Sequence, residues 1–168
     1  DRALEVGAVD TAHLDMTEAA GDADLVVICT PVVEVCRKLA EVAPLVKKEC
    51  ILTDVASTKE QVCAEARRLF GVPCRFIGSH PMAGSEKFGA EHGRPDFYEG
   101  SVVLMEPGTP AHDAKAHAAV RALWEAVGGR VVEIDPAEHD VRLARTSHVP
   151  HVAAGAIAMA ADAAGDVR

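Results

Sequence analysis

Short apolar runs alternate along this chain with longer segments whose apolar residues recur at helical spacing. The apolar runs occupy residues 25–30, 51–55, 75–77, 102–105 and 131–134. The helical spacing is found at residues 32–42, 57–70 and 111–127. Such alternation is typical of βαβ units, so the pattern predicts an α/β fold with a doubly wound, mostly parallel sheet. The β-branched run 25–30 is expected to be a strand buried on both faces.

Local signals indicate where several helices begin and end. Ser57 and Glu60 have the S-x-x-E spacing of a capping box, in which two side chains satisfy the first N–H groups of a helix. Asp135 is predicted to cap the helix that starts at Pro136, with Glu138 as its reciprocal cap.

The two ends of the chain differ from its centre. Residues 3–7 are typical of the last turn of a helix, and no G-x-G-x-x-G occurs anywhere. Residues 152–161 are apolar nearly all round, as in a helix buried against other helices. We therefore expect an α/β domain that is incomplete at its N-terminus, followed by the start of an all-α domain.

Charge and cysteine content limit the kinds of partner and compartment. The formal net charge is −9 and no Lys/Arg cluster offsets it, so neither a nucleic-acid partner nor a membrane surface is expected. No apolar run approaches membrane-spanning length. Five cysteines without a C-x-x-C pair are interpreted as buried thiols of a cytoplasmic protein.

The segment 78–100 is too long for an ordinary turn and is dense in Gly, Pro, His and charged residues. Long loops in compact domains are usually functional or disordered, and apolar residues throughout this one favour function. It follows a predicted strand and holds a histidine and a glutamate, which is where an α/β enzyme places its chemistry.

Several motifs resemble the prephenate/arogenate (cyclohexadienyl) dehydrogenase family. They are G-S-H-P-M-A-G-S-E-K-F-G at 78–89, F-Y-E-G at 97–100, W-E-A-V-G-G at 124–129, H-D at 139–140 and S-H-V-P-H at 147–151. The resemblance implies a Rossmann-like NAD(P)-binding domain over residues 1–140 and the start of a helical dimerisation domain over residues 141–168. It also implies a homodimer that oxidatively decarboxylates prephenate to 4-hydroxyphenylpyruvate in tyrosine biosynthesis, with NAD or NADP as hydride acceptor.

The resemblance makes His80 the catalytic histidine, and an imidazole suits the task of taking a proton from the ring hydroxyl. It makes Ser57 a helper of His80. The alternative for Ser57 is the helix cap described above, unless Thr58 and Gln61 form that cap instead.

By the same resemblance, Ser147 and His151 line the substrate pocket and Glu86 belongs to a gating ionic network, whereas His148 is structural. Glu86 has a solvated carboxylate as its alternative. His139, His148 and His151 lack a partner Cys, Asp or Glu at ligand spacing, so no metal site is predicted.

The cofactor is expected to meet backbone at the ends of two predicted strands. The residues concerned are Thr30, Pro31, Val32, Val55 and Ala56. The Gly-rich turn and the arginine that would clamp the substrate's side chain are absent, so residues 1–168 alone are expected to be inactive.

Three other functions remain open. The chain has the features of an arogenate dehydrogenase as much as of a prephenate dehydrogenase. One alternative is a different β-hydroxyacid-type dehydrogenase, but that function does not explain the H-P-M-A-G-S-E motif. Another is a binding fragment without a cofactor, which would bind neither dinucleotide.

Overall fold

A twisted sheet forms the centre of the protein, seen in a computed structural model that describes residues 2–84, 87 and 89–163. Strands β1 (Leu25–Ile28), β2 (Ile51–Asp54) and β3 (Phe76–Ile77) are parallel and adjacent in that order. A second group has the order β4 (Ser79–Pro81), β5 (Val102–Met105) and β6 (Arg130–Glu133). Only Gly78 separates β3 from β4, so one bent chain segment belongs to both groups.

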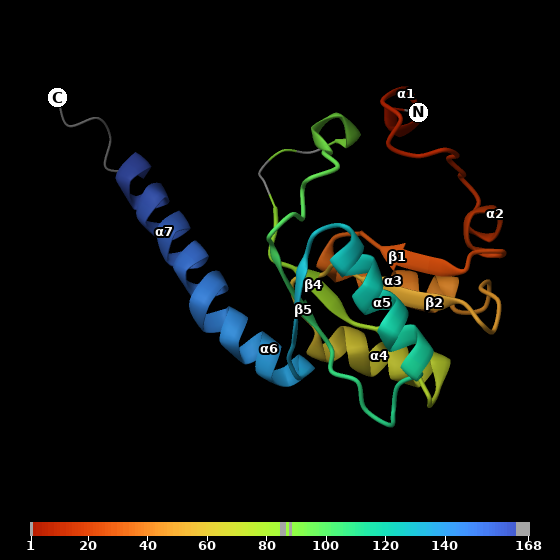
Figure 1. Cartoon of the computed structure of the whole chain (residues 1–168). Coiled ribbons are helices and arrows are strands. Elements are labelled where there is room, and N and C mark those ends of the chain that lie inside the picture. Colours follow the sequence, from red (N-terminus) through yellow and green to blue (C-terminus); the bar gives the residue numbers. More distant parts are fainter. Residues whose placement is uncertain (1, 85–86, 88, 164–168) are drawn as a thin grey trace.

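Helices cover both faces of this sheet (Figure 1). Helices α3 (Val32–Val42) and α4 (Glu60–Phe70) bury Val35, Leu39 and Val62 in one apolar core with Leu52 and Phe76. Helix α5 (Ala114–Ala126) buries its residues in a second core with strand residues from β3 and β5. Since adjacent residues of a strand point to opposite faces, Phe76 and Ile77 contribute to different cores. The predicted doubly wound α/β fold is confirmed, with β4 and β5 as its antiparallel pair.

Strand β1 is less buried than its sequence predicts. Leu25 and Val27 keep 36% and 37% of their surface exposed, whereas Ile28 is buried. β1 lies at the edge of the sheet, and one of its faces borders an open apolar groove next to the short helix α2 (Met16–Ala20). The expectation of burial on both faces is therefore wrong within the described residues, because this face of β1 has no helix packed fully across it.

The long segment 78–100 begins as a strand rather than as a loop. Ser79, His80 and Pro81 pair antiparallel with β5, and Met82 N continues the ladder to Val102 O at 2.7 Å. A single 3₁₀ turn, Ala90–His92, lies farther along, close to helix α1 (Arg2–Glu5). His80 is consequently held by a hydrogen-bonded ladder and not by loop packing alone.

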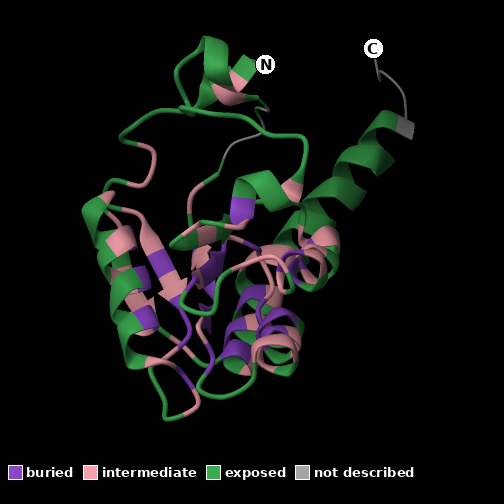
Figure 2. Ribbon diagram, turned by 90° about the vertical axis from the view of Figure 1, so that its right-hand side faces the viewer, coloured by how far each residue is buried: buried purple, intermediate pink, exposed green. Residues whose placement is uncertain are grey.

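The C-terminal part is one helical rod. Helix α6 (Pro136–Leu143) runs through a wider π-helical turn, Ala144–His148, into α7 (Val149–Ala163). Asp135 caps α6 as predicted, but the Glu138 carboxylate binds Arg142 and not the cap. Helix α7 projects from the body and is exposed along its described length (Figures 1 and 2).

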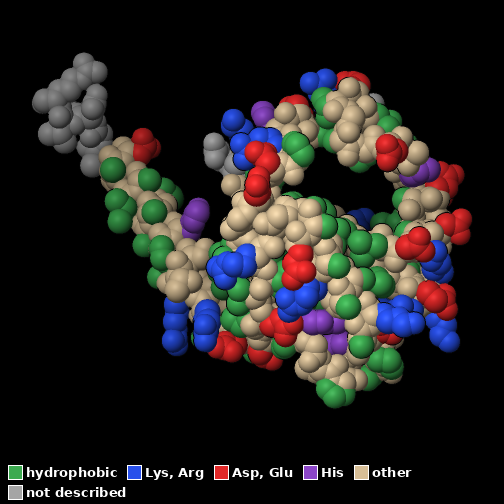
Figure 3. All heavy atoms as spheres, in the orientation of Figure 1, with side chains coloured by type: hydrophobic (Ala, Val, Ile, Leu, Met, Phe, Trp, Pro, Cys, Tyr) green, Lys and Arg blue, Asp and Glu red, His purple; other side chains and the backbone are tan. Residues whose placement is uncertain are grey.

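The surface of α7 is apolar although it is exposed. Val149, Val152, Ile157 and Met159 retain 62–75% of their surface, and hydrophobic side chains follow the rod in Figure 3. On the body, acidic and basic side chains are interspersed over the face shown. None of the helices in the described part of the chain is long and apolar enough to cross a membrane.

Candidate active site

Three side chains form a hydrogen-bonded series that starts at His80. His80, on β4, has its Nδ1 2.9 Å from Nε2 of His139 on α6. Nδ1 of His139 lies 2.7 Å from Oδ1 of Asp140. His139 is fully buried, whereas His80 and Asp140 at the two ends of the series are partly buried.

The series ends at the N-terminus of α4. Asp140 Oδ1 accepts from Lys59 N at 2.7 Å, and Oδ2 accepts from Glu60 N at 3.0 Å. The first N–H groups of α4 are thus satisfied by a carboxylate from another helix, which also suits the positive end of the helix dipole. The capping box predicted from Ser57 and Glu60 is wrong, and Ser57 is not occupied as the cap of α4.

A buried ion pair lies under the turn that carries Ser57. Asp54 ends β2 and is fully buried, and its carboxylate pairs with the Lys59 ammonium, itself 3% exposed. Asp54 also accepts from Ala56 N at 3.0 Å and from Ser79 N at 3.1 Å. Because Ser79 precedes His80, this one carboxylate fixes the Ser57 turn relative to the strand of His80.

The side chain of Ser79 is anchored on the other side of the sheet. Its Oγ lies 2.8 Å from Thr53 Oγ1 and accepts from Trp124 Nε1 at 3.0 Å. All three residues are buried, so these hydrogen bonds are sheltered from water and hold β4 against β2 and α5. His80 therefore sits on a rigid support.

Burial controls the protonation of the site. It lowers the pKa of His80 from 6.5 to about 4, with help from His139, Lys59 and His148. Burial also lowers the pKa of His139, against the opposing effect of Asp140. For Asp140 itself burial favours a higher pKa, but hydrogen bonds from Glu60 N, His139 and Lys59 N together lower it. The site at neutral pH thus holds two neutral imidazoles and a carboxylate.

Asp54 differs from Asp140 in its environment. Burial raises the pKa of the Asp54 carboxyl, and the Lys59 ammonium and two backbone N–H groups oppose that rise. Because both side chains of the Asp54–Lys59 pair are buried, the pair has a structural role in the site.

The predicted substrate residues lie on the C-terminal rod. Ser147 and His148 belong to the π-helical turn and are partly buried, whereas His151 is exposed on α7. His148, expected to be structural, contributes to the lowered pKa of His80 and so lies within its electrostatic reach. Glu86 lies outside the described residues.

The predicted cofactor residues gather at the carboxyl ends of β1 and β2. Thr30 and Pro31 lead from β1 into α3 at Val32, and Val55 and Ala56 follow β2. Val55 N donates to Ile28 O at 3.3 Å, which joins the two strand ends. Thr30 Oγ1 is buried and has no hydrogen-bond partner among the described residues, so it fits a ligand with a polar group at this edge.

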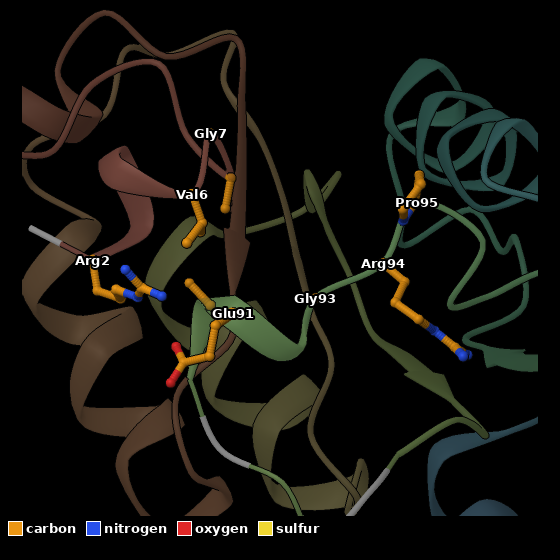
Figure 4. Close-up of a pocket in the computed structure, with 9 residues that line it drawn as sticks. Arg2, Val6, Gly7, Glu91, Gly93, Arg94 and Pro95 are labelled. Atoms are coloured by element: carbon orange, nitrogen blue, oxygen red, sulfur yellow. The ribbon is translucent and has the colours of Figure 1, made fainter.

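A separate pocket lies away from those predicted catalytic, substrate and cofactor residues that the structure describes. It measures about 700 Å³ and is lined by Arg2 and residues 6–8 on one side and by Ala90, Glu91 and residues 93–95 on the other (Figure 4). Among its ionisable side chains are two arginines and one glutamate, and the histidines of the site do not line it. In the described part of the chain no cluster of three potential ligands suits a metal ion.

Sequence reasoning missed the partners of His80. It names Asp140 only in the dipeptide H-D and His139 only there and as a rejected metal ligand, and it includes Lys59 only in a helix start. One sequence feature could have indicated these partners. A histidine and an aspartate, His139 and Asp140, follow the predicted helix cap Asp135 by one helical turn. His80 and His139 are 59 positions apart, and no pattern in the sequence indicates that they are in contact.

Comparisons with known proteins identify the family of the chain. Residues 1–133 match the family model described as prephenate dehydrogenase, nucleotide-binding domain. The cyclohexadienyl dehydrogenase of Zymomonas mobilis is 36% identical over 156 residues, which cover 92% of this chain and 52% of that protein. The chain thus spans about half the length of this relative.

Two crystal structures of prephenate dehydrogenase from Aquifex aeolicus have the same fold. One superposes with a TM-score of 0.89 at 28% identity, covering 98% of this chain and 59% of that one. The other, in complex with hydroxyphenyl propionate and NAD+, gives a TM-score of 0.87 at 30% identity and covers 94% and 55%. The match over residues 1–133, together with these relatives, shows that the chain belongs to the prephenate dehydrogenase family.

Proposed function

We propose that this protein takes part in the oxidative decarboxylation of prephenate to 4-hydroxyphenylpyruvate, with hydride transfer to NAD or NADP, in tyrosine biosynthesis. The observation that carries the proposal is the neutral, partly accessible His80 on a rigid strand, beside the strand ends where a dinucleotide is bound in this fold. The Aquifex relative holds NAD+ and a hydroxyphenyl acid together, which supports a site of this kind.

His80 is the proton acceptor in this proposal. As hydride leaves the carbinol carbon, the ring hydroxyl loses its proton to the imidazole, and loss of carbon dioxide completes an aromatic ring. A pKa of about 4 keeps His80 neutral and ready to accept. Prephenate brings two carboxylates, and negative charge near an imidazole raises its pKa toward the range in which a general base is most effective.

In this proposal Ser57 assists His80. Its side chain is available for that role, because Asp140 and not Ser57 caps α4. Ser147 and His151 line the substrate pocket and Glu86 gates it. His151 is exposed on α7 and is therefore accessible to a substrate in this proposal.

The cofactor is NAD or NADP, held by Thr30, Pro31, Val32, Val55 and Ala56. The Thr30 hydroxyl has no partner among the described residues, which supports this placement because a buried hydroxyl needs a hydrogen-bonding group. A nicotinamide held there would supply the hydride acceptor.

We further propose the division into a nucleotide-binding domain, residues 1–140, and the beginning of a helical dimerisation domain, residues 141–168. The exposed apolar surface of α7 supports a homodimer formed through that helical domain, since such a surface is rarely left in water. The five cysteines are free, which supports a cytoplasmic location. Only Cys50, Cys63 and Cys74 are buried, so the expectation of five buried thiols is wrong for Cys29, which is exposed, and for Cys36, which is partly buried.

An assay with prephenate, arogenate and small hydroxyacids, each with NAD and NADP, tests the proposal in the complete enzyme. We expect turnover of prephenate, arogenate or both, and none of the hydroxyacids. The His80→Asn variant should reduce turnover by about 10²-fold or more. Turnover of hydroxyacids alone, or near-normal turnover by this variant, contradicts the proposal, and absent binding of both dinucleotides favours a cofactor-free module.

A further inference from the structure

The series from His80 to Asp140 determines which ring nitrogens carry protons. The Asp140 carboxylate already accepts from two backbone N–H groups, and an ionised carboxylate is only an acceptor. The contact of 2.7 Å to His139 Nδ1 therefore requires a proton on that nitrogen. Because a neutral imidazole carries one N–H, Nε2 of His139 holds a lone pair.

The same reasoning applies one step farther along. Nε2 of His139 is an acceptor and lies 2.9 Å from His80 Nδ1, so this nitrogen of His80 is the donor. Nε2 of a neutral His80 is then unprotonated. Nε2 is therefore the nitrogen of His80 that can accept a proton. This tautomer of His80 follows from the fixed position of the Asp140 carboxylate.

We propose that His139 and Asp140 are positioning residues that hold His80 in its Nδ1–H tautomer and leave Nε2 free to accept the substrate's hydroxyl proton. When that proton arrives, the O–H bond breaks and an Nε2–H bond forms on His80, while the electron pair of the O–H bond remains with the substrate. The resulting imidazolium donates to His139, whose own donor faces the negative charge of Asp140. The role in proton acceptance rests on the proposed function, but the tautomer does not.

The groups around the pair favour this assignment. Lys59 and His148 disfavour additional positive charge at His80, and Asp140 favours it. Asp140 is fixed by the α4 terminus, so it cannot turn away from His139 without leaving two N–H groups without their acceptor. The tautomer of the partly accessible His80 is thus set by the buried His139 and the partly buried Asp140.

Nitrogen-15 NMR of histidine-labelled chain 1–168 tests the tautomer directly. We expect His80 and His139 both to carry their proton on Nδ1. The His139→Phe variant keeps a ring but removes the acceptor, so His80 should become a mixture of tautomers. The His139→Gln variant keeps an amide oxygen that can accept from His80 and should retain the Nδ1–H form. His80 protonated mainly on Nε2 in the unchanged chain, or unaffected by His139→Phe, overturns the proposal.

A matched pair of cap variants separates positioning from helix stability. Asp140→Asn and Asp113→Asn each alter an aspartate that accepts from two backbone N–H groups at the start of a helix. Only Asp140→Asn should change the His80 spectrum, because Asp113 caps α5 and is not part of the series. The same spectral change in both variants overturns the proposal.

Kinetics of the complete enzyme give the second readout. His139→Phe should lower kcat about 10-fold or more while KM changes little, and His139→Gln should recover part of the loss. An unchanged kcat in His139→Phe overturns the positioning role. If the unaltered enzyme turns over none of the tested substrates, the proposed function fails, and the NMR result still decides the tautomer.

Discussion

Asp140 and Lys59 lie 81 positions apart in the sequence, yet the Asp140 carboxylate accepts a hydrogen bond of 2.7 Å from the Lys59 backbone nitrogen. The contact joins the start of α4 to α6. Since His139 is the neighbour of Asp140, the same contact also fixes the position of the His139 ring, which is hydrogen-bonded to His80. His80 is therefore linked through His139 and Asp140 to the beginning of the helix that follows Ser57.

Removal of the Asp140 carboxylate should destabilise the protein. In Asp140→Ala the first N–H groups of α4 lose their acceptor, which costs about 1 kcal/mol of unfolding free energy. Ser57→Ala is the matched variant, and its effect should stay within about 0.5 kcal/mol because Ser57 does not cap the helix. Urea unfolding of both variants measures the difference. A larger loss in Ser57→Ala would restore the capping box.

The same contact shows where sequence reasoning was sufficient and where it was not. The alternation of β-branched runs with helical spacing predicted β1, β2 and α3, because these elements are determined by local periodicity. The capping box failed because its S-x-x-E pattern is equally local, whereas the actual acceptor comes from α6. A cap supplied across the fold leaves no signal near the helix it caps.

The candidate site was predicted in part for a related reason. A specific motif identified His80, but its neighbours His139 and Asp140 follow from how α6 packs on α4 and β4. The exposure of β1 was also beyond prediction, since periodicity reports that a strand is apolar and not which elements cover it. The roles of all the predicted site residues stay predictions, the catalytic role of His80 among them.

The buried pair of Asp54 and Lys59 should be strongly coupled. Lys59→Met leaves the Asp54 carboxylate enclosed without its counter-ion and should cost about 3–5 kcal/mol at pH 7. The double variant Asp54→Asn with Lys59→Met removes both charges and should be less destabilised than Lys59→Met alone. Denaturant unfolding of the single and double variants gives the coupling free energy, and strictly additive losses would contradict it.

The pH dependence of Lys59→Met provides a second check on that pair. Burial raises the pKa of Asp54, and without Lys59 the largest opposing influence is gone. A carboxyl whose folded pKa lies above its unfolded pKa loses stability as the pH rises through the folded pKa. The deficit of Lys59→Met relative to the unaltered protein should therefore shrink on acidification from pH 7. A deficit that grows instead would show that Asp54 is not the carboxylate concerned.

Gly78 has no room for a side chain where β3 passes into β4. A Cβ built at this position would lie 2.5 Å from Cys63 Sγ, and both residues are buried. Gly78→Ala should therefore cost about 1–3 kcal/mol through overpacking. Adding Cys63→Ala removes the opposing sulfur, so the double variant should be more stable than the sum of the two single losses predicts. Thermal or urea unfolding measures this, and additive losses would contradict the clash.

Protonation of His80 should destabilise the folded protein at acidic pH. Its pKa falls from 6.5 to about 4 on folding, so between these values the unfolded chain binds more protons than the folded one. Stability should consequently decline as the pH drops from about 6.5 toward 4, and His139, whose pKa is also lowered, acts in the same direction. His80→Asn should flatten this slope in part. Unfolding free energies of both proteins across this range, with an NMR titration of His80, measure the effect. A His80 midpoint close to 6.5 would contradict it, because an imidazole that is neither buried nor opposed by Lys59 and His148 titrates there.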